Sequence, residues 1–179
     1  RGSSRRFLEL LGEQVRREKP DADSLVSAAT RCRVPIFVPA LADSSIGIGL
    51  VIARRRGVDV DVDQIADTDE ITRIVEDAGR TGVVYIGGGV PKNFIQQTQV
   101  IASIHEHEQG GHAYAIQYTT DAPHFGGLSG CTFDEAVSWG KEAPASPRVQ
   151  CFVDATIALP LVTSALIGRG EQRAGRAPS

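Results

Sequence analysis

The sequence predicts a Rossmann-like α/β fold, with a largely parallel sheet covered by helices on both faces. Short β-branched segments alternate with segments whose apolar residues recur at helical spacing. This alternation is typical of βαβ crossovers, which join parallel strands. Three consecutive glycines at residues 87–89 follow an apolar segment at residues 83–86, and Pro91 then suits the first turn of a helix. A strand, a bare turn and a helix in this order fit the same fold class.

The individual elements follow from periodicity and from end signals. Phe7, Leu8, Leu11 and Val15 recur at the spacing of one helical face. Gly79 predicts a helix end, because glycine is favoured just past a C-terminus. Residues 34–40 are short, β-branched and bounded by prolines, which predicts a buried strand. The patterns predict helices over residues 5–18, 21–32, 44–56, 67–79, 91–107 and 131–140, a buried helix over 157–168, and further strands over 81–89, 112–120 and 148–156.

Length and composition predict one ordinary globular domain. The chain has 179 residues, 41% hydrophobic and 23% charged, with a net charge of −3. We expect a single α/β domain over residues 1–167 and a disordered, polar, glycine-rich tail over residues 168–179. No basic field favours nucleic acid or a membrane surface, and the apolar runs are too short to span a bilayer. Three cysteines without a CxxC pair indicate reduced thiols in a cytoplasmic protein.

Four segments are candidates for a binding site, because ligands of parallel α/β sheets lie at the carboxyl ends of the strands. They are residues 40–45, 87–89, 119–121 and 153–154, which carry glycine, hydroxyl or carboxylate groups. We expect them to converge on one edge of the sheet. The glycine turn by itself fits either a phosphate-binding backbone or a tight structural turn, since it does not match GxGxxG.

A histidine-rich segment, "HEHEQGGH", contains His105, His107 and His112. Histidines two residues apart do not share a helical face, and the spacing matches neither HExxH nor a zinc finger. We therefore expect a solvated helix end followed by a Gly-Gly turn, and no metal site.

The segment "HFGGLSGCTFDEAVSWGK" carries the strongest chemical signal. Lys141 is one of only three lysines in the chain and follows Trp139 and Gly140. An apolar indole wall favours the neutral, nucleophilic form of an amine, which can form a Schiff base. Glu135 could pair with a cationic substrate or hold the lysine. The alternative is a structural one, with Trp139 in the core and Lys141 as a solvated cation at a helix end.

Several motifs resemble those of the deoxyhypusine synthase family. They are "VPIFVPALADSSIG", "GGGVPKN", "TTDAPHFGGLSG", "DEAVSWGK" and "FVDAT", and the resemblance covers roughly residues 33–165. The resemblance corresponds to the C-terminal half of the family's usual length. The chain begins with Arg1 and contains no methionine, so we expect a fragment, a processed piece or a recombinant start.

The resemblance implies an NAD-dependent transferase that moves an aminobutyl group from spermidine to an acceptor amine through an enzyme-lysine imine. It implies that Lys141 is the nucleophile. It implies cofactor contacts from Asp43, Gly87, Gly88, Gly89, Thr120, Val153 and Asp154, and substrate contacts from Glu135, Trp139, Gly126, Gly127, Leu128, Asn93 and His124. It also implies NAD as cofactor, a homotetramer, and a lysine of translation factor 5A as acceptor.

Three positions depart from the eukaryotic form of the family pattern. Ile48 and Leu128 stand where that pattern has acids, and Asn93 stands where it has a histidine. Carboxylates anchor polyammonium groups through charge-assisted bonds, so these changes leave the donor and the acceptor open. "TTDAPHFGGLSGC" is similar to the archaeal and bacterial branch. The alternatives are a homospermidine synthase-like enzyme with a small amine acceptor, and a noncatalytic fragment that supplies part of an NAD-binding or subunit interface.

Overall fold

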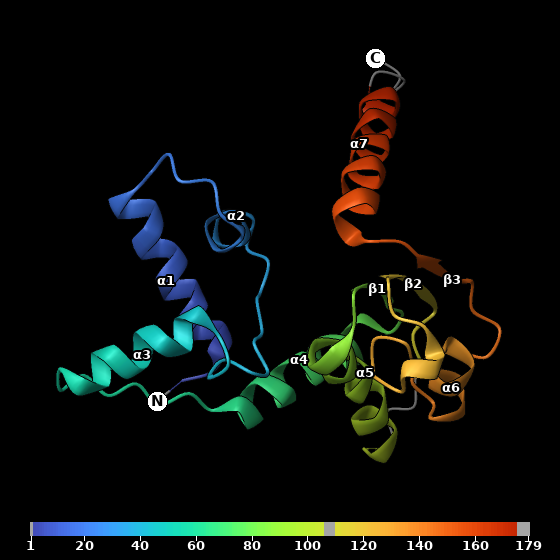
Figure 1. The fold of residues 1–179 in the computed structure, drawn as a ribbon, viewed down its shortest axis with the longest axis horizontal. Coiled ribbons are helices and arrows are strands. Elements are labelled where there is room, and N and C mark those ends of the chain that lie inside the picture. Colours follow the sequence, from blue (N-terminus) through green and yellow to red (C-terminus); the bar gives the residue numbers. More distant parts are fainter. Residues whose placement is uncertain (1, 106–109, 175–179) are drawn as a thin grey trace. The chain divides into compact units, whose positions relative to one another are not determined.

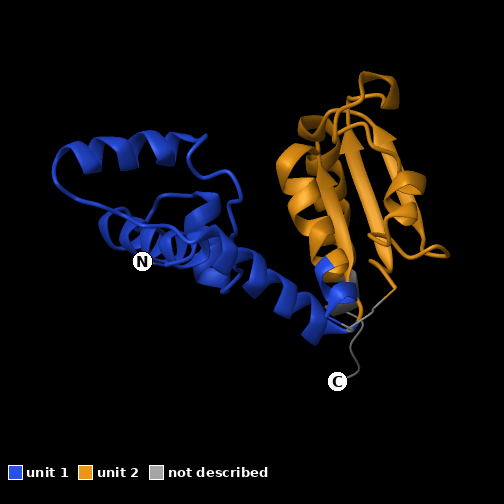
Figure 2. Cartoon of the chain, turned by 90° about the horizontal axis from the view of Figure 1, so that it is seen from below, with its two compact units in different colours: residues 1–79, 101–107 blue, residues 80–100, 108–179 orange. Residues whose placement is uncertain are grey.

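The computed structural model describes residues 2–105 and 110–174, and it divides the chain into two compact units. Unit 1 comprises residues 1–79 and 101–107, and unit 2 comprises residues 80–100 and 108–179 (Figure 2). The predicted single domain over residues 1–167 stays a prediction, and each unit is described by itself.

Unit 1 contains four helices that begin at well-formed caps (Figure 1). Each cap side chain accepts a hydrogen bond from the backbone N–H three residues later, which satisfies a donor that the helix itself leaves free. The helices are α1 (Ser4–Glu18), α2 (Leu25–Cys32), α3 (Ser45–Arg55) and α4 (Gln64–Ala78), with caps Ser3, Ser24, Ser44 and Asp63. These four helices confirm the predicted ones within one to three residues at most ends.

A buried carboxylate joins α1 to α4. Asp67 accepts hydrogen bonds from the backbone N–H groups of Ser4, at 2.8 Å, and Arg5, at 3.1 Å. The Ser4 hydroxyl in turn accepts a bond from the N–H of Val38, at 2.8 Å. A negative charge at the N-terminus of α1 also complements the helix dipole. One residue pair thus holds two helices and the segment that contains Val38.

The strand predicted over residues 34–40 is wrong, because this segment has no regular secondary structure. Pro35 and Pro39 lack the backbone N–H that a strand donates to its neighbour. Two of the remaining donors bond outside any sheet, with Val34 N–H directed to Ala29 O and Val38 N–H to the Ser4 hydroxyl at the start of α1. Val34 is exposed, so the expectation of burial fails as well.

Unit 2 is built on a parallel sheet, which confirms the predicted α/β fold class. The strands are β1 (Gly82–Ile86), β2 (Tyr114–Thr119) and β3 (Arg148–Phe152), hydrogen-bonded in the order β1-β2-β3. α5 (Gly89–Ile104) follows β1, and α6 (Phe133–Ser138) lies between β2 and β3. In Figure 2 helical ribbon flanks the strands of this unit on both sides. Tyr85, Ala115 and Phe133 form a core cluster with Val83 and Ile95.

α6 ends at Ser138, slightly before the predicted end near Gly140, because Gly140 closes it in a left-handed conformation at φ +72°. The Gly140 N–H donates to Val137 O at 2.9 Å, and the Lys141 N–H donates to Ala136 O at 3.0 Å. This pair of bonds is the Schellman arrangement, which satisfies the last carbonyls of a helix. The sequence missed this end by about two residues.

α7 (Ala155–Ala174) differs from its prediction in burial and in length. Its apolar side chains are largely exposed, Ile157, Leu161, Leu166 and Ile167 among them, so the predicted burial is wrong. The helix continues past Gly168, where the tail was expected to begin, and residues 175–179 lie outside the described part. Within residues 2–105 and 110–174, no helix is both long enough and apolar enough to cross a bilayer.

Candidate functional site

Three of the four predicted segments lie at the same edge of the sheet. Ile86 is in register with Tyr118, and Tyr118 with Cys151, so β1, β2 and β3 end level with one another. Residues 87–89, 119–121 and 153–154 follow these strand ends, as expected for a parallel sheet. The fourth segment, residues 40–45, belongs to unit 1.

The glycine turn packs directly against the loop of residues 126–131, which we call the substrate loop after the substrate contacts that the family resemblance implies for it. A Cβ added at Gly88 would lie 2.3 Å from Ser129 Cα, so only glycine allows this approach. Gly87 and Gly89 have φ values of +74° and +68°, and open space surrounds the position of a Cβ at each. Close packing therefore requires glycine at position 88, whereas Gly87 and Gly89 present bare backbone beside the start of α5.

The substrate loop and α6 enclose a small cavity of about 150 Å³. Glu135 and Cys131 are the ionisable groups in its wall. Burial and the nearby Glu135 carboxylate raise the pKa of the Cys131 thiol, which keeps that thiol protonated. Four residues predicted to contact substrate thus come together here; the complete lining is Pro123, Gly126, Gly127, Leu128, Gly130, Cys131, Thr132 and Glu135.

Lys141 is half-buried, and its side chain is held from α5. Its Nζ donates a hydrogen bond to Asn93 Oδ1 at 3.1 Å, and it lies 6.0 Å from the centroid of the Trp139 ring. Trp139 itself is 67% exposed, so it is neither a core residue nor an enclosing wall in this chain. The structure brings together Lys141, Asn93 and Trp139 but leaves the indole open to solvent.

The backbone at Lys141 is fixed by a buried histidine. The His112 N–H donates to Lys141 O, and the Ala143 N–H donates to His112 O, each at 3.1 Å. The His112 ring is 1% exposed, and its Nδ1 lies 2.7 Å from the Thr81 hydroxyl. His112 lies beyond the Gly-Gly turn, whereas His105, at the predicted solvated helix end, is exposed and His107 lies outside the described residues. Among the described residues, no group of three or more His, Cys, Asp or Glu could hold a metal ion.

His112 should make the protein sensitive to acid. Burial lowers the pKa of His112 to about 4, from an ordinary value of 6.5, so the unfolded chain binds this proton more readily. The resulting loss in the free energy of unfolding is absent well above pH 6.5 and grows as the pH falls towards 4. We expect His112→Asn, which keeps a polar group near Thr81 but does not titrate, to remove about 2–3 kcal/mol of the stability lost between about pH 7.5 and 4.5.

Urea unfolding of the wild type and the variant at both pH values measures this difference. Burial raises the pKa of Glu142, which opposes the effect of His112 over part of the range, but Glu142 is present in both proteins and cancels. Equal pH dependence in the two proteins would show that His112 does not titrate as its burial requires.

Comparison with known proteins places these motifs in one family. The family model described as deoxyhypusine synthase matches residues 1–166. This chain belongs to the deoxyhypusine synthase family. It is 69% identical over 164 residues to a probable deoxyhypusine synthase 2 of Methanosarcina acetivorans, covering 92% of this chain and 48% of the relative.

Two further relatives of the deoxyhypusine synthase family span the archaeal and bacterial branches. A probable deoxyhypusine synthase 2 of Archaeoglobus fulgidus is 53% identical, covering 96% of this chain and 56% of the relative. A deoxyhypusine synthase-like protein of Elusimicrobium minutum is 40% identical, covering 90% of this chain and 44% of the relative. The chain thus spans about half the length of the curated relatives it matches.

The remaining residues assigned by the deoxyhypusine synthase resemblance lie apart from the cavity lining. Asp154 caps α7, because its Oδ1 accepts bonds from the N–H and the hydroxyl of Thr156, at 2.8 and 2.6 Å, and these bonds lower the pKa of the carboxyl. Thr120 and Val153 follow the ends of β2 and β3.

His124 packs on Phe125 in a short 3-10 helix, Pro123–Phe125, with ring centroids 4.2 Å apart. Asp43 is exposed in unit 1, directly before the cap of α3.

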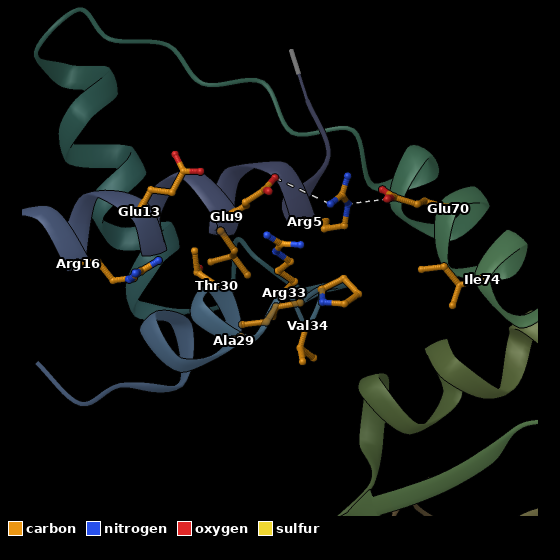
Figure 3. Close-up of a pocket in the computed structure, with 13 residues that line it drawn as sticks. Arg5, Glu9, Glu13, Arg16, Ala29, Thr30, Arg33, Val34, Glu70 and Ile74 are labelled. Atoms are coloured by element: carbon orange, nitrogen blue, oxygen red, sulfur yellow. Dashed lines mark ion pairs between the residues drawn. The ribbon is translucent and has the colours of Figure 1, made fainter. Parts of the chain in front are cut away.

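A larger cavity of about 510 Å³ lies within unit 1 and holds none of the residues assigned by the family resemblance (Figure 3). Arg5 forms ion pairs with Glu70 on α4 and Glu9 on α1, as the dashed lines mark. Glu9 also pairs with Arg6 at 2.7 Å. These charges compensate one another, and the Arg5–Glu70 pair links α1 to α4, which gives Arg5 a structural role.

Sequence reasoning missed a buried polar network beneath the family motif. Tyr85 donates a hydrogen bond to Glu142 Oε1 at 2.6 Å, and both side chains are buried. Lys92 and Gln117 are buried as well and hydrogen-bond to each other. Lys92 directly precedes Asn93 and Glu142 directly follows Lys141. This adjacency to predicted site residues was the sequence feature that could have pointed to the network.

Proposed function

We propose that the protein carrying this chain transfers an aminobutyl group from spermidine, or a related polyamine, to an acceptor amine in an NAD-dependent reaction, with Lys141 as nucleophile. The observation that carries the proposal is the setting of Lys141. Its backbone is clamped by His112 and the end of α6, and its Nζ is held by Asn93 on the helix that begins in the glycine turn. An amine held by the helix that begins in the glycine turn suits transfer through a lysine imine.

The residues at the sheet edge fit NAD. Gly87 and Gly89 leave backbone bare next to the N-terminus of α5, a 16-residue helix whose first N–H groups favour a pyrophosphate. Asp154 and Thr120 supply polar groups at the ends of the neighbouring strands. These residues would hold NAD, which would supply the hydride acceptor for oxidation of the donor amine and the hydride donor for reduction of the final imine to the product amine. Asp43 is proposed as a further cofactor contact on the family resemblance alone.

The chain's own groups account for the transfer. The Lys141 amine, unprotonated, attacks the imine carbon of the oxidised donor, and 1,3-diaminopropane leaves with the displaced nitrogen. The aminobutyl group is then held on Lys141 as an imine until the acceptor amine displaces it and frees the lysine. Glu135 in the cavity wall suits the ammonium end of the aminobutyl chain. Asn93, by accepting from Lys141 Nζ, orients the amine before attack.

The acceptor is proposed to be a lysine of translation factor 5A, as the family resemblance implies, and the complete protein is proposed to be a homotetramer. The exposed apolar side chains of α7 support an oligomer, because large exposed apolar areas mark contact surfaces. A small amine acceptor would make the protein homospermidine synthase-like.

Incubating the protein at its full native length with NAD and spermidine labelled in the aminobutyl group tests the proposal. We expect label to pass to an acceptor, with 1,3-diaminopropane released in equal amount. Translation factor 5A and putrescine, offered separately, distinguish the two acceptor classes. Absence of diaminopropane with either acceptor, and with other polyamines as donors, would favour the noncatalytic alternative.

A further inference from the structure

We propose that Lys92 and Gln117 form a positioning pair that holds the substrate loop against the glycine turn and so fixes the cavity and the start of α6. The pair touches neither the cavity space nor the Lys141 amine, and it acts through the backbone of the loop. Its effect on turnover rests on the proposed function, whereas its hold on the loop does not.

Gln117 is the centre of this arrangement. It lies on the middle strand β2, is 0% exposed, and uses its whole amide group. Its Nε2 donates to Gly87 O at 2.8 Å and to Ser129 O at 2.9 Å. One side chain therefore bonds the backbone of the glycine turn and the backbone of the substrate loop at the same time.

Lys92 completes the hold from α5. Its Nζ donates to Gln117 Oε1 at 3.0 Å and to Cys131 O at 2.9 Å, and the residue is only 3% exposed. The ammonium group also lies 5.4 Å from the centroid of the Tyr85 ring. These bonded acceptors are both neutral, and burial lowers the pKa of Lys92. A buried ammonium bonded to neutral partners is costly, so its hydrogen bonds must satisfy it.

The carbonyls that the pair binds are those that shape the site. Ser129 and Cys131 belong to the substrate loop, and Thr132 caps α6 immediately after it. α6 then leads to Lys141, whose Nζ is held by Asn93, the residue next to Lys92. Adjacent residues of α5 thus fix the beginning and the end of the segment from the loop to the nucleophile. Releasing the Lys92 end should let the cavity and α6 shift while Lys141 keeps its own bond.

Hydrogen exchange and kinetics on the full-length protein test the pair. Lys92→Met keeps the apolar stem but removes both donated bonds, and Gln117→Leu removes the central amide. Val83→Ala is the matched control, because Val83 packs on the same core cluster but makes no polar contact with the loop. We expect amide exchange over residues 127–132 to speed up at least about tenfold in the first two variants, in excess of any change in the control.

Turnover should respond in the same two variants. We expect kcat to fall about 10- to 100-fold with KM changed much less, because misplaced reacting groups lose rate more than ground-state binding. A loss of stability alone, as in Val83→Ala, lowers the amount of folded protein but not kcat per folded molecule.

Unchanged exchange over residues 127–132 would show that the pair does not hold the loop. Faster exchange with undiminished kcat would show that the pair holds the loop but does not position the reacting groups. If Lys92→Met does not fold, Gln117→Leu decides by the same criteria. A wild-type protein without turnover would count against the proposed function alone, since the exchange measurement still decides whether the pair holds the loop.

Discussion

Replacing Lys141 with arginine is expected, under the proposed function, to abolish aminobutyl transfer and with it the covalent adduct that borohydride should trap on the wild-type protein. A guanidinium group stays protonated and cannot form the imine, whereas it keeps the positive charge of the lysine. We expect turnover to fall by at least about 10³-fold, as for loss of a nucleophile. NAD affinity should survive, because the proposed cofactor contacts come from the glycine turn, Thr120 and Asp154. Borohydride reduction in the presence of NAD and labelled spermidine, followed by peptide mapping, measures the adduct.

Lys19 provides the matched control for this experiment. It is an exposed lysine at the C-terminal cap of α1, outside the proposed site, so Lys19→Arg should leave both adduct and turnover unchanged. An adduct mapped to Lys92, or full turnover in Lys141→Arg, would remove Lys141 from the mechanism.

Gly88→Ala is expected to have the second-largest effect, because the added methyl group has no room. Its Cβ would lie 2.3 Å from Ser129 Cα and 2.9 Å from Ser129 N, and these are backbone atoms that cannot rotate away. The glycine turn and the substrate loop must separate, which should lower the free energy of unfolding by about 1–3 kcal/mol. Denaturant unfolding measures the loss, and titration of NAD should show weaker binding.

Gly127→Ala is the matched substitution within the substrate loop. A Cβ at Gly127 meets no atom within 4 Å, so its unfolding free energy should stay close to that of the wild type. Equal stability of Gly88→Ala and Gly127→Ala would contradict the close approach of the two backbones.

The sheet of unit 2 was predictable because its sequence pattern is local. Each strand is a short β-branched or aromatic segment followed by a turn residue and a helical pattern, and parallel pairing then places the strand ends at one edge. The same local reasoning failed for residues 34–40, where the prolines that seemed to bound a strand instead remove its donors. It failed again for α7, whose apolar composition predicted burial although Leu161 and Ile167 are exposed in the part of the chain that the structure describes.

The motif residues of the site were predictable, but their supporting network was not. Gly126, Gly127, Leu128 and Glu135 were predicted to contact substrate, and they line one cavity. Glutamine and lysine ordinarily occupy surfaces and histidine is intermediate, so residue type alone did not mark Gln117, Lys92 and His112 as buried. Their burial depends on carbonyl groups of distant loops, such as Ser129 O, Cys131 O and Lys141 O, which only the folded chain brings near.

The Schellman end of α6 separates the position of residue 141 from the identity of its side chain. The bonds that fix this residue use its backbone N–H, to Ala136 O, and its carbonyl, from the His112 N–H. Neither bond involves the amine, so the length of the side chain can be varied without rebuilding the turn that presents it. Amino acids whose amine-bearing side chain is one methylene shorter or longer than that of lysine would keep the same backbone bonds at residue 141. The distance from the backbone to the amine could therefore be varied independently of the turn.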